Sequence, residues 1–193
     1  AMGARIARDD PSPGDIVIAV PDSGSSAALG YALASGVELE HGLTRKHYMS
    51  RTFIQPTTAR REMGVRMKLH PVRKAIEGRR VTVIDDSLVR GTTSRQMVRL
   101  LREAGAREVH LRLSSPPLRF PCFFGIDIPT RDELISNRLD PDGIAREIGA
   151  DSVRFLSLDA LRSCVDRPDD YCAACFSGDY PCPVRDAPVH RKC

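Results

Sequence analysis

The chain has no tryptophan, and aromatic residues make up only 5% of its 193 positions. Proteins that bind single-stranded nucleic acid stack the bases on aromatic side chains, so this scarcity argues against that class. The net charge of +4 is modest and spread along the chain, which does not indicate a nucleic-acid surface. No apolar run approaches the ~20 residues that cross a bilayer, and no secretory signal is visible. We therefore expect a protein that binds neither nucleic acid nor membrane.

Cysteine is missing from the first 121 residues, and all six cysteines follow that point. Cys172 and Cys175 form a C-x-x-C pair, a spacing that is usual for thiolates bound to zinc or to an iron–sulfur cluster. Cys122 lies apart from this pair, between a proline and two phenylalanines. These three residues are the candidate metal ligands of the sequence.

The most informative feature is a strand–loop–helix pattern at residues 81–94. An apolar-rich run leads into two adjacent carboxylates, Asp85 and Asp86, and a turn with one glycine and four hydroxyl residues follows. Such a loop presents backbone N–H groups and the positive end of a helix to a phosphate. The carboxylates can hold sugar hydroxyls or a metal ion. We therefore expect a ribose phosphate site here; the alternative is an ordinary strand-to-helix turn with capping residues.

Apolar runs alternate with helical patterns along the chain, which predicts an α/β fold with a mostly parallel sheet wound by right-handed crossovers. We expect strands at 15–20, 79–86, 109–113 and 153–158, and helices at 1–7, 26–35, 58–69, from the 81–94 segment to Gly105, and in two pieces of 131–148 broken by Pro141. Ligands gather at the carboxyl ends of such strands. Asp22-Ser23 and Asp85-Asp86 both follow a predicted strand, so we expect them to meet in one site.

The 81–94 segment resembles the phosphoribosyl pyrophosphate (PRPP) loop of type I phosphoribosyltransferases, and residues 85–94 look most like the glutamine PRPP amidotransferase family. The resemblance runs from about residue 1 to about residue 181. It implies the type I phosphoribosyltransferase fold, a central mostly parallel sheet flanked by helices, with a flexible lid loop. Further matching segments are 20–24, 51–56, 64–68, 114–117 and 121–127.

The resemblance implies a reaction in which ammonia displaces pyrophosphate from PRPP to give 5-phosphoribosylamine, the first step of de novo purine synthesis. Magnesium is the implied cofactor, with Ser23, Asp85 and Asp86 near the metal and the ribose hydroxyls. The lid residues Lys46, Tyr48 and Arg51 are the implied catalytic participants. The implied PRPP-binding residues are Asp85, Asp86, Ser87, Arg90, Gly91, Thr92, Thr93 and Ser94.

Enzymes of this family begin with a glutaminase domain whose first residue is a nucleophilic cysteine. We therefore expect this chain to be the phosphoribosyltransferase half at residues 1–165, followed by a cysteine-containing segment at 166–193. It would use free ammonia and have no glutaminase activity of its own. The resemblance also implies a cytoplasmic homo-oligomer that is inhibited by purine nucleotides.

In one branch of the family, three cysteines in the contexts of Cys122, Cys172 and Cys175 hold a 4Fe-4S cluster with a fourth, upstream cysteine. That fourth position is not in this chain, and nothing in the contexts of Cys164, Cys182 or Cys193 supports a substitute. Disulfides are disfavoured because a nucleotide-biosynthetic enzyme belongs in a reducing compartment. The cluster would be structural, since the reaction has no redox step.

Three other functions remain open from the sequence. A salvage phosphoribosyltransferase would share the 81–94 segment, but we would not expect it to share the 51–56 segment or the cysteine pattern. A regulatory PRPP-binding module would need a DNA-binding extension and a basic recognition surface, and the sequence shows neither. An inactive remnant of a longer protein would fold without ammonia-dependent turnover.

Overall fold

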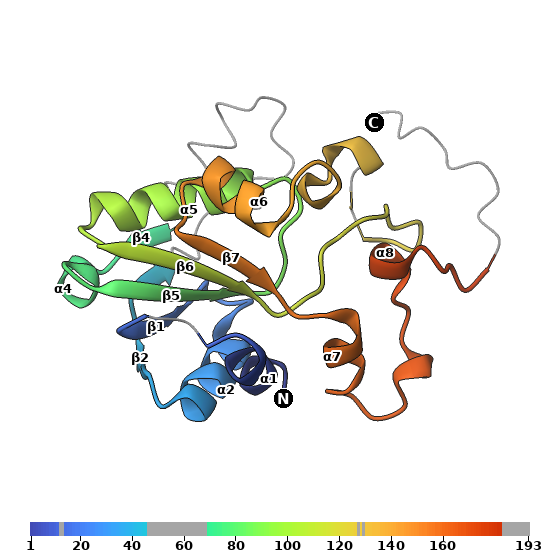
Figure 1. Ribbon diagram of the computed structural model, residues 1–193, viewed down its shortest axis with the longest axis horizontal. Coiled ribbons are helices and arrows are strands. Elements are labelled where there is room, and N and C mark those ends of the chain that lie inside the picture. The colour runs from blue at the N-terminus through green and yellow to red at the C-terminus, as the bar shows by residue number, and fades with distance from the viewer. Residues whose placement is uncertain (12–13, 46–68, 127, 129, 183–193) are drawn as a thin grey trace.

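The computed structural model describes residues 1–11, 14–45, 69–126, 128 and 130–182. A five-stranded sheet runs through the molecule in the order β2-β1-β5-β6-β7, and its four strand pairings are all parallel (Figure 1). The strands are β2 (Glu38–Glu40), β1 (Ile16–Ala19), β5 (Arg80–Asp85), β6 (Glu108–Leu113) and β7 (Ser152–Phe155). The α/β architecture expected from the alternating pattern is confirmed.

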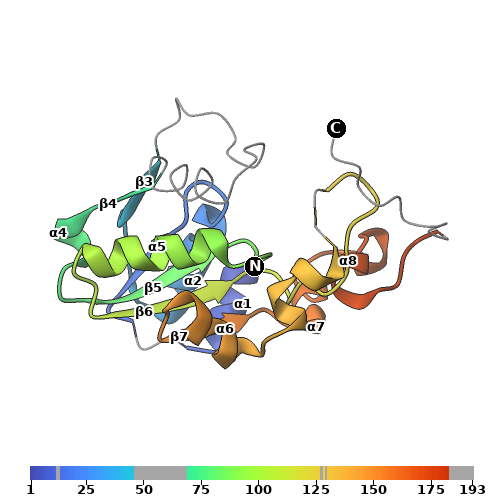
Figure 2. The same ribbon diagram turned by 90° about the horizontal axis from the view of Figure 1, so that it is seen from above.

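Helices cover both faces of this sheet. Figure 1 shows α1 (Met2–Asp9) and α2 (Ser25–Ser35) on one face, and α5 (Thr92–Glu103) and α6 (Pro141–Ile148) on the other. The view from above in Figure 2 shows α5 lying along the strands that it covers. Parallel strands covered on both faces read as nearly continuous apolar runs, which is why 16–20 and 81–84 stand out in the sequence.

The core is divided by the sheet into two clusters. Ile16 and Ile18 of β1 pack on the α5 side, whereas Val17 between them packs on the α1–α2 side. The helix expected between the loop and Gly105 is found as α5, and its Met97 and Leu101 are buried in the α5-side cluster. Both clusters anchor the strands whose carboxyl ends carry the predicted site residues.

Several smaller elements were not expected. An antiparallel pair joins β3 (Leu43–Arg45) to β4 (Leu69–Pro71), and short helices form at α4 (Arg73–Ile76) and α7 (Leu158–Arg162). The helix expected at 58–69 lies outside the described residues, except that Leu69 belongs to β4. The expected division of 131–148 into two helical pieces at Pro141 is confirmed, since 3-10 helices at Arg131–Glu133 and Ile135–Asn137 precede a separate helix, α6. Pro141 begins α6, because Asp140 caps that helix by accepting a 2.7 Å hydrogen bond from the Gly143 N–H.

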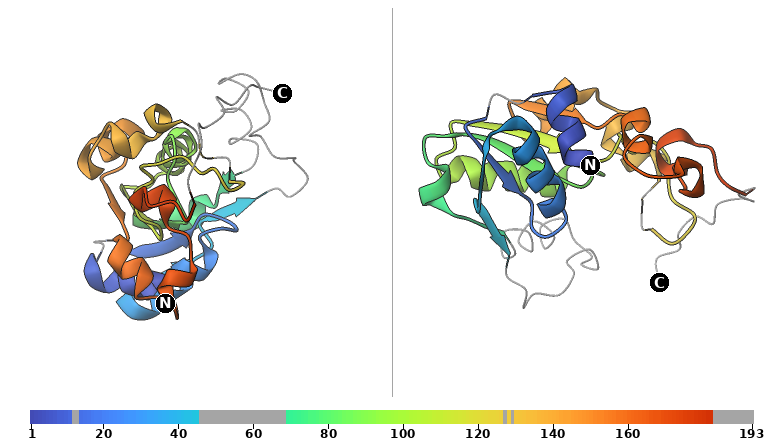
Figure 3. Two further views of the ribbon diagram at one scale, coloured as in Figure 1. Left: turned by 90° about the vertical axis from the view of Figure 1, so that its right-hand side faces the viewer. Right: turned by 90° about the horizontal axis from the view of Figure 1, so that it is seen from below.

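The chain after α7 lies beyond the carboxyl ends of the strands, as Figure 3 shows from two sides. This segment contains a short 3-10 helix (Pro168–Asp170) and α8 (Ala174–Ser177). It packs on residues 118–134, where Leu118, Ile128 and Leu134 form a third apolar cluster with Cys122, Cys175 and Phe176. The backbone N–H groups of Arg119 and Phe120 both donate to the Cys175 carbonyl, at 3.0 and 3.1 Å. No helix in the described part of the chain is long and apolar enough to span a membrane.

Candidate functional site

Two strand ends meet at the centre of the sheet. β1 and β5 are adjacent and parallel, with Ala19 opposite Ile84, and the Val20 N–H donates to the Ile84 carbonyl at 2.9 Å. Just beyond these positions the Ser23 hydroxyl donates to Asp85 Oδ1 at 3.2 Å. The expectation that 22–23 and 85–86 converge is therefore met by a direct side-chain contact.

The two carboxylates at this point differ in their surroundings. Asp85 is 8% exposed, whereas Asp86 is exposed to solvent. Asp85 Oδ1 also accepts the Asp86 N–H at 2.8 Å, and Asp86 Oδ1 accepts the Ser87 N–H at 2.7 Å. Burial, and then the neighbouring charge of Asp86, raise the pKa of Asp85 from 3.8 to about 7. Because ionised Asp85 is destabilised by burial and by Asp86, a cation or a hydroxyl donor that binds beside it would stabilise its charged form.

The loop at residues 86–94, which we call the phosphate loop, leads directly into α5. Gly91 precedes the helix with a φ of 81°, a left-handed conformation that favours glycine. The first turn of α5 has no acidic residue, and no side chain among the described residues caps its N-terminal N–H groups. Thr93 is exposed and Thr92 half-buried, while Ser94 is buried. This end of α5 has the polarity that an anion prefers.

Arg90 differs from its neighbours in the loop. Its Nε donates to Glu133 Oε2 at 2.7 Å, so the guanidinium lies against the 3-10 helix of Arg131–Glu133. The predicted residues Asp85, Asp86, Ser87 and Gly91 to Ser94 are thus brought together in one strand–loop–helix segment. The Arg90 side chain is directed to a partner that the sequence pattern did not indicate.

Two further residues at the site were missed by sequence reasoning. Arg45, at the end of β3, places its Nη1 3.5 Å from Asp22 Oδ2. Ser114, just after β6, donates its N–H and its hydroxyl to the Asp85 carbonyl, at 3.0 and 3.3 Å. Two signals were available for Ser114: its position after a predicted strand and its place in the matching segment 114–117. The predicted lid residues Lys46, Tyr48 and Arg51 lie outside the described residues.

The cysteines of the C-x-x-C pair come near Cys122. Burial raises the pKa of the Cys175 thiol, and the nearby Cys122 and Cys172 raise it further. In the part of the chain that the structure describes, however, no group of three or more cysteine, histidine or acidic side chains is arranged to hold a metal ion. The described cysteines are all free thiols.

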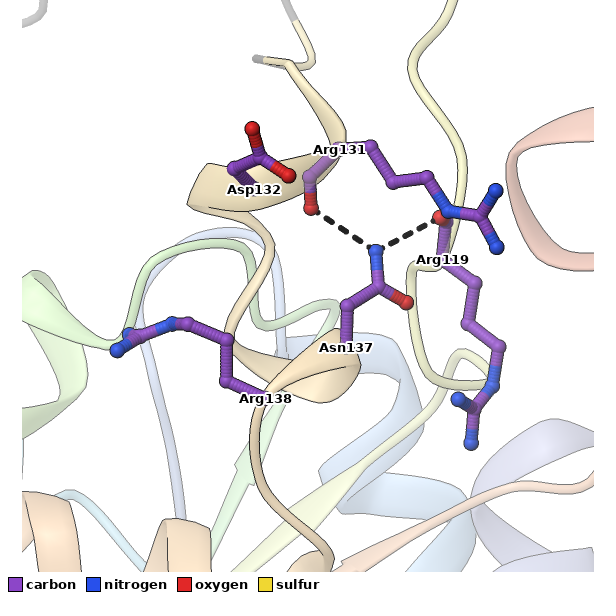
Figure 4. Close-up of a pocket in the computed structure, with 5 residues that line it drawn as sticks. All are labelled: Arg119, Arg131, Asp132, Asn137 and Arg138. Carbon is purple, nitrogen blue, oxygen red and sulfur yellow. Dashed lines mark hydrogen bonds between the residues drawn. The ribbon is translucent and has the colours of Figure 1, made fainter.

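A pocket of about 440 Å³ is lined by residues between 119 and 138, and none of its lining residues lies at a strand end. Figure 4 shows the Asn137 amide at its centre, donating to the carbonyls of Arg119 and Arg131 at 2.9 Å each. The Arg138 side chain extends to the opposite side of Asn137 from the Arg119 and Arg131 guanidinium groups, so the three cations do not converge (Figure 4). The candidate site therefore rests on the chemistry of the strand ends.

Known proteins with high sequence similarity to this chain share one name, amidophosphoribosyltransferase. The chain is 53% identical over 191 residues to an Arabidopsis thaliana protein named amidophosphoribosyltransferase 1, chloroplastic. It is 51% identical over 185 residues to the Bacillus subtilis amidophosphoribosyltransferase, and 52% over 180 residues to the Pyrococcus horikoshii one. These alignments cover 93 to 98% of this chain. No family model matches the chain.

Solved structures agree with the sequence comparison. A glutamine PRPP amidotransferase from B. subtilis, complexed with ADP and GMP, superposes with a TM-score of 0.82 at 49% identity. The match covers 96% of this chain and 42% of that one. A structure described as the allosteric regulatory enzyme of purine biosynthesis gives the same TM-score at 50% identity. The chain spans 34 to 39% of the length of the three relatives named above.

Proposed function

Because this chain is homologous over nearly its whole length to one region of the amidophosphoribosyltransferases, we propose that it forms the PRPP-binding half of such an enzyme. In this reaction ammonia attacks the anomeric carbon of PRPP, pyrophosphate leaves, and 5-phosphoribosylamine forms. The observation that carries the proposal is the contact of Ser23 with Asp85 at the mouth of the phosphate loop. In this contact the Asp85 carboxyl, which can bind a diol or a metal ion, belongs to the same strand–loop–helix segment as the N-terminal end of α5, which suits a phosphate.

The chemistry needs little from general bases, because free ammonia is already a nucleophile. Departure of pyrophosphate builds positive charge on the ribose and negative charge on the leaving group, so orientation and electrostatic stabilisation dominate. Asp85 and Asp86 would hold the ribose hydroxyls. The N–H groups at Gly91 and along the first turn of α5, with the hydroxyls of Thr92 and Thr93, would hold the 5′-phosphate. Lys46, Tyr48 and Arg51 are proposed as the cationic and polar cover over the pyrophosphate.

Magnesium suits the carboxyl pair. The raised pKa of Asp85 is relieved when a cation lies nearby, since both burial and Asp86 disfavour a second uncompensated negative charge. Ser23, Asp85 and Asp86 would be the residues beside the ion. Bound there, magnesium would neutralise charge on the pyrophosphate oxygens.

We also propose Cys122, Cys172 and Cys175 as iron–sulfur ligands, completed by a thiolate from outside this chain. Cys122 and Cys172 both raise the pKa of the Cys175 thiol, which supports the proximity of the three cysteines. Reconstitution with iron and sulfide should produce visible charge-transfer absorbance, and Cys172→Ser should abolish it. Equal absorbance in Cys172→Ser and in a Cys164→Ser control would contradict the assignment.

Nucleotide regulation is proposed on the same relationship. The B. subtilis relative was solved with ADP and GMP, so purine nucleotides are the effectors to test first. Assembly as a homo-oligomer and a cytoplasmic location stay predictions, and several plant relatives carry the word chloroplastic in their names.

The decisive test of the proposed function is release of pyrophosphate from PRPP in the presence of magnesium and an ammonium salt at mildly alkaline pH. We expect turnover with ammonium and none with glutamine. Asp85→Asn should abolish turnover, whereas Asp169→Asn, an exposed acid of the C-terminal segment, should not. A folded preparation without ammonia-dependent turnover would favour a binding module or an inactive remnant.

A further inference from the structure

The phosphate loop is held from behind by residues 130–135. Arg90 Nε donates to Glu133 Oε2 at 2.7 Å, and the other carboxylate oxygen of Glu133 accepts the Thr130 hydroxyl at 3.3 Å. The Glu133 N–H also donates to the Thr130 carbonyl at 3.0 Å. Thr130 therefore holds Glu133 in place independently of the contact with Arg90.

The same segment contacts the residues on either side of Arg90. The Ile135 N–H donates to the Val89 carbonyl at 3.0 Å. Ile135 is fully buried, and its Cδ1 would lie 2.8 Å from a Cβ placed on Gly91. Three consecutive loop residues, 89 to 91, are thus held through a backbone hydrogen bond, an ion pair and a close packing contact.

We propose that Glu133 is a positioning residue for the PRPP site, and that Arg90 serves the phosphate through its backbone N–H while its guanidinium ties the loop to Glu133. This inference rests on the proposed function. A loop whose N–H groups already point at the phosphate loses less conformational freedom on binding, so the ion pair strengthens substrate binding without touching the substrate.

An alternative arrangement makes the opposite prediction. If the Arg90 guanidinium left Glu133 to contact a phosphate oxygen directly, Glu133 would compete with the substrate for Arg90. Removing the Glu133 carboxylate would then tighten PRPP binding or leave it unchanged. The two arrangements therefore differ in the sign of one measurable effect.

The expected effect is modest. The side chains of Arg90 and Glu133 are 39% and 48% exposed, so solvent screens their interaction. The interaction energy of ion pairs with this exposure corresponds to about a two- to fivefold change in an equilibrium constant. Loss of the Arg90 guanidinium and loss of the Glu133 carboxylate should each weaken PRPP binding by that factor.

The experiment is a double-mutant cycle on PRPP binding with magnesium, measured by isothermal titration calorimetry. Arg90→Met keeps most of the aliphatic stem, Glu133→Ala removes the carboxylate, and Asp132→Ala is the matched control from the same helical turn. We expect both single variants and the double variant to bind about two- to fivefold more weakly, with the double no worse than the weaker single. Asp132→Ala should bind like the unaltered chain.

Kinetics and unfolding separate positioning from general damage. Glu133→Ala should raise KM for PRPP with kcat unchanged, and its urea midpoint should match that of Asp132→Ala. Tighter or equal PRPP binding by Glu133→Ala overturns the inference while leaving the proposed function in place. Failure of the unaltered, folded chain to bind PRPP overturns the proposed function and the inference with it.

Discussion

Replacing Asp85 by asparagine should stabilise the fold at alkaline pH while destroying the site. The asparagine side chain keeps an oxygen that can accept the Ser23 hydroxyl and the Asp86 N–H, but it removes the buried charge. The pKa of Asp85 is raised above its unfolded value of 3.8 to about 7, chiefly by burial. The protonated Asp85 side chain therefore contributes its full stabilisation of the fold below pH 3.8, and this stabilisation is lost as the pH rises through about 7.

The size of the effect follows from the same shift. Each unit of pKa corresponds to about 1.4 kcal/mol, so ionising Asp85 costs the fold at most about 4 kcal/mol above pH 7. The part of this cost that develops between pH 5 and pH 8 is about 2–3 kcal/mol. The stability of Asp85→Asn relative to the unaltered chain should rise by that amount over this interval.

Urea unfolding followed by far-UV circular dichroism suits the measurement, because the chain has no tryptophan to report by fluorescence. Asp86→Asn is the control, since it removes the second cause of the raised pKa but leaves the buried carboxyl in place. It should show a smaller pH-dependent gain. A difference between Asp85→Asn and the unaltered chain that stays constant from pH 5 to pH 8 would refute the reasoning.

Other substitutions test the loop, the core and the sheet edge, each by its urea midpoint. Gly91→Ala should cost about 1–3 kcal/mol, because its φ is 81° and a Cβ would lie 2.8 Å from Ile135 Cδ1; an unchanged midpoint would show that the loop can relax. Leu101→Ala should cost about 2–5 kcal/mol as a fully buried core residue of α5, and a loss below that range would mean that the core collapses around the gap. Hydrogen bonds from Arg80 lower the pKa of Asp15 to about 2, so its contribution is present above pH 3.8 and is lost as the pH falls through about 2. Asp15→Asn should therefore cost under about 1 kcal/mol of stability at pH 7, since the Asp15–Arg80 ion pair is partly exposed. This loss of stability should shrink below pH 3.8. A loss that grows below pH 3.8 would contradict the lowered pKa of Asp15.

The parts of the fold that were predictable are those whose own residues carry the signal. β5 and β1 are apolar runs because both faces of the parallel sheet are covered, and the acids after β5 fall at a strand end for the same reason. The contact between Ser23 and Asp85 follows from strand pairing, since parallel neighbours end at the same edge.

Other parts depend on partners that are distant in sequence. β2 contains two glutamates around Leu39 and is largely exposed, so it is a strand by virtue of its pairing with β1 rather than its composition. Glu133 lies 43 residues from Arg90, and a charged residue in a short 3-10 turn carries no local sign of its partner. Pro141 differs from these cases, because its local sign correctly separates the two helical pieces of 131–148.

The third apolar cluster joins the phosphate loop to the C-terminal segment. Val89 of the phosphate loop packs on Leu118, Ile128 and Leu134, and Cys175 packs there from the opposite end of the chain. Any shortened version of the protein that stops before residue 166 would leave these side chains open to water and remove the support behind residues 130–135. Protein engineers who trim the chain for crystallisation or display should therefore place the cut after α8, even though that tail contributes no strand to the sheet.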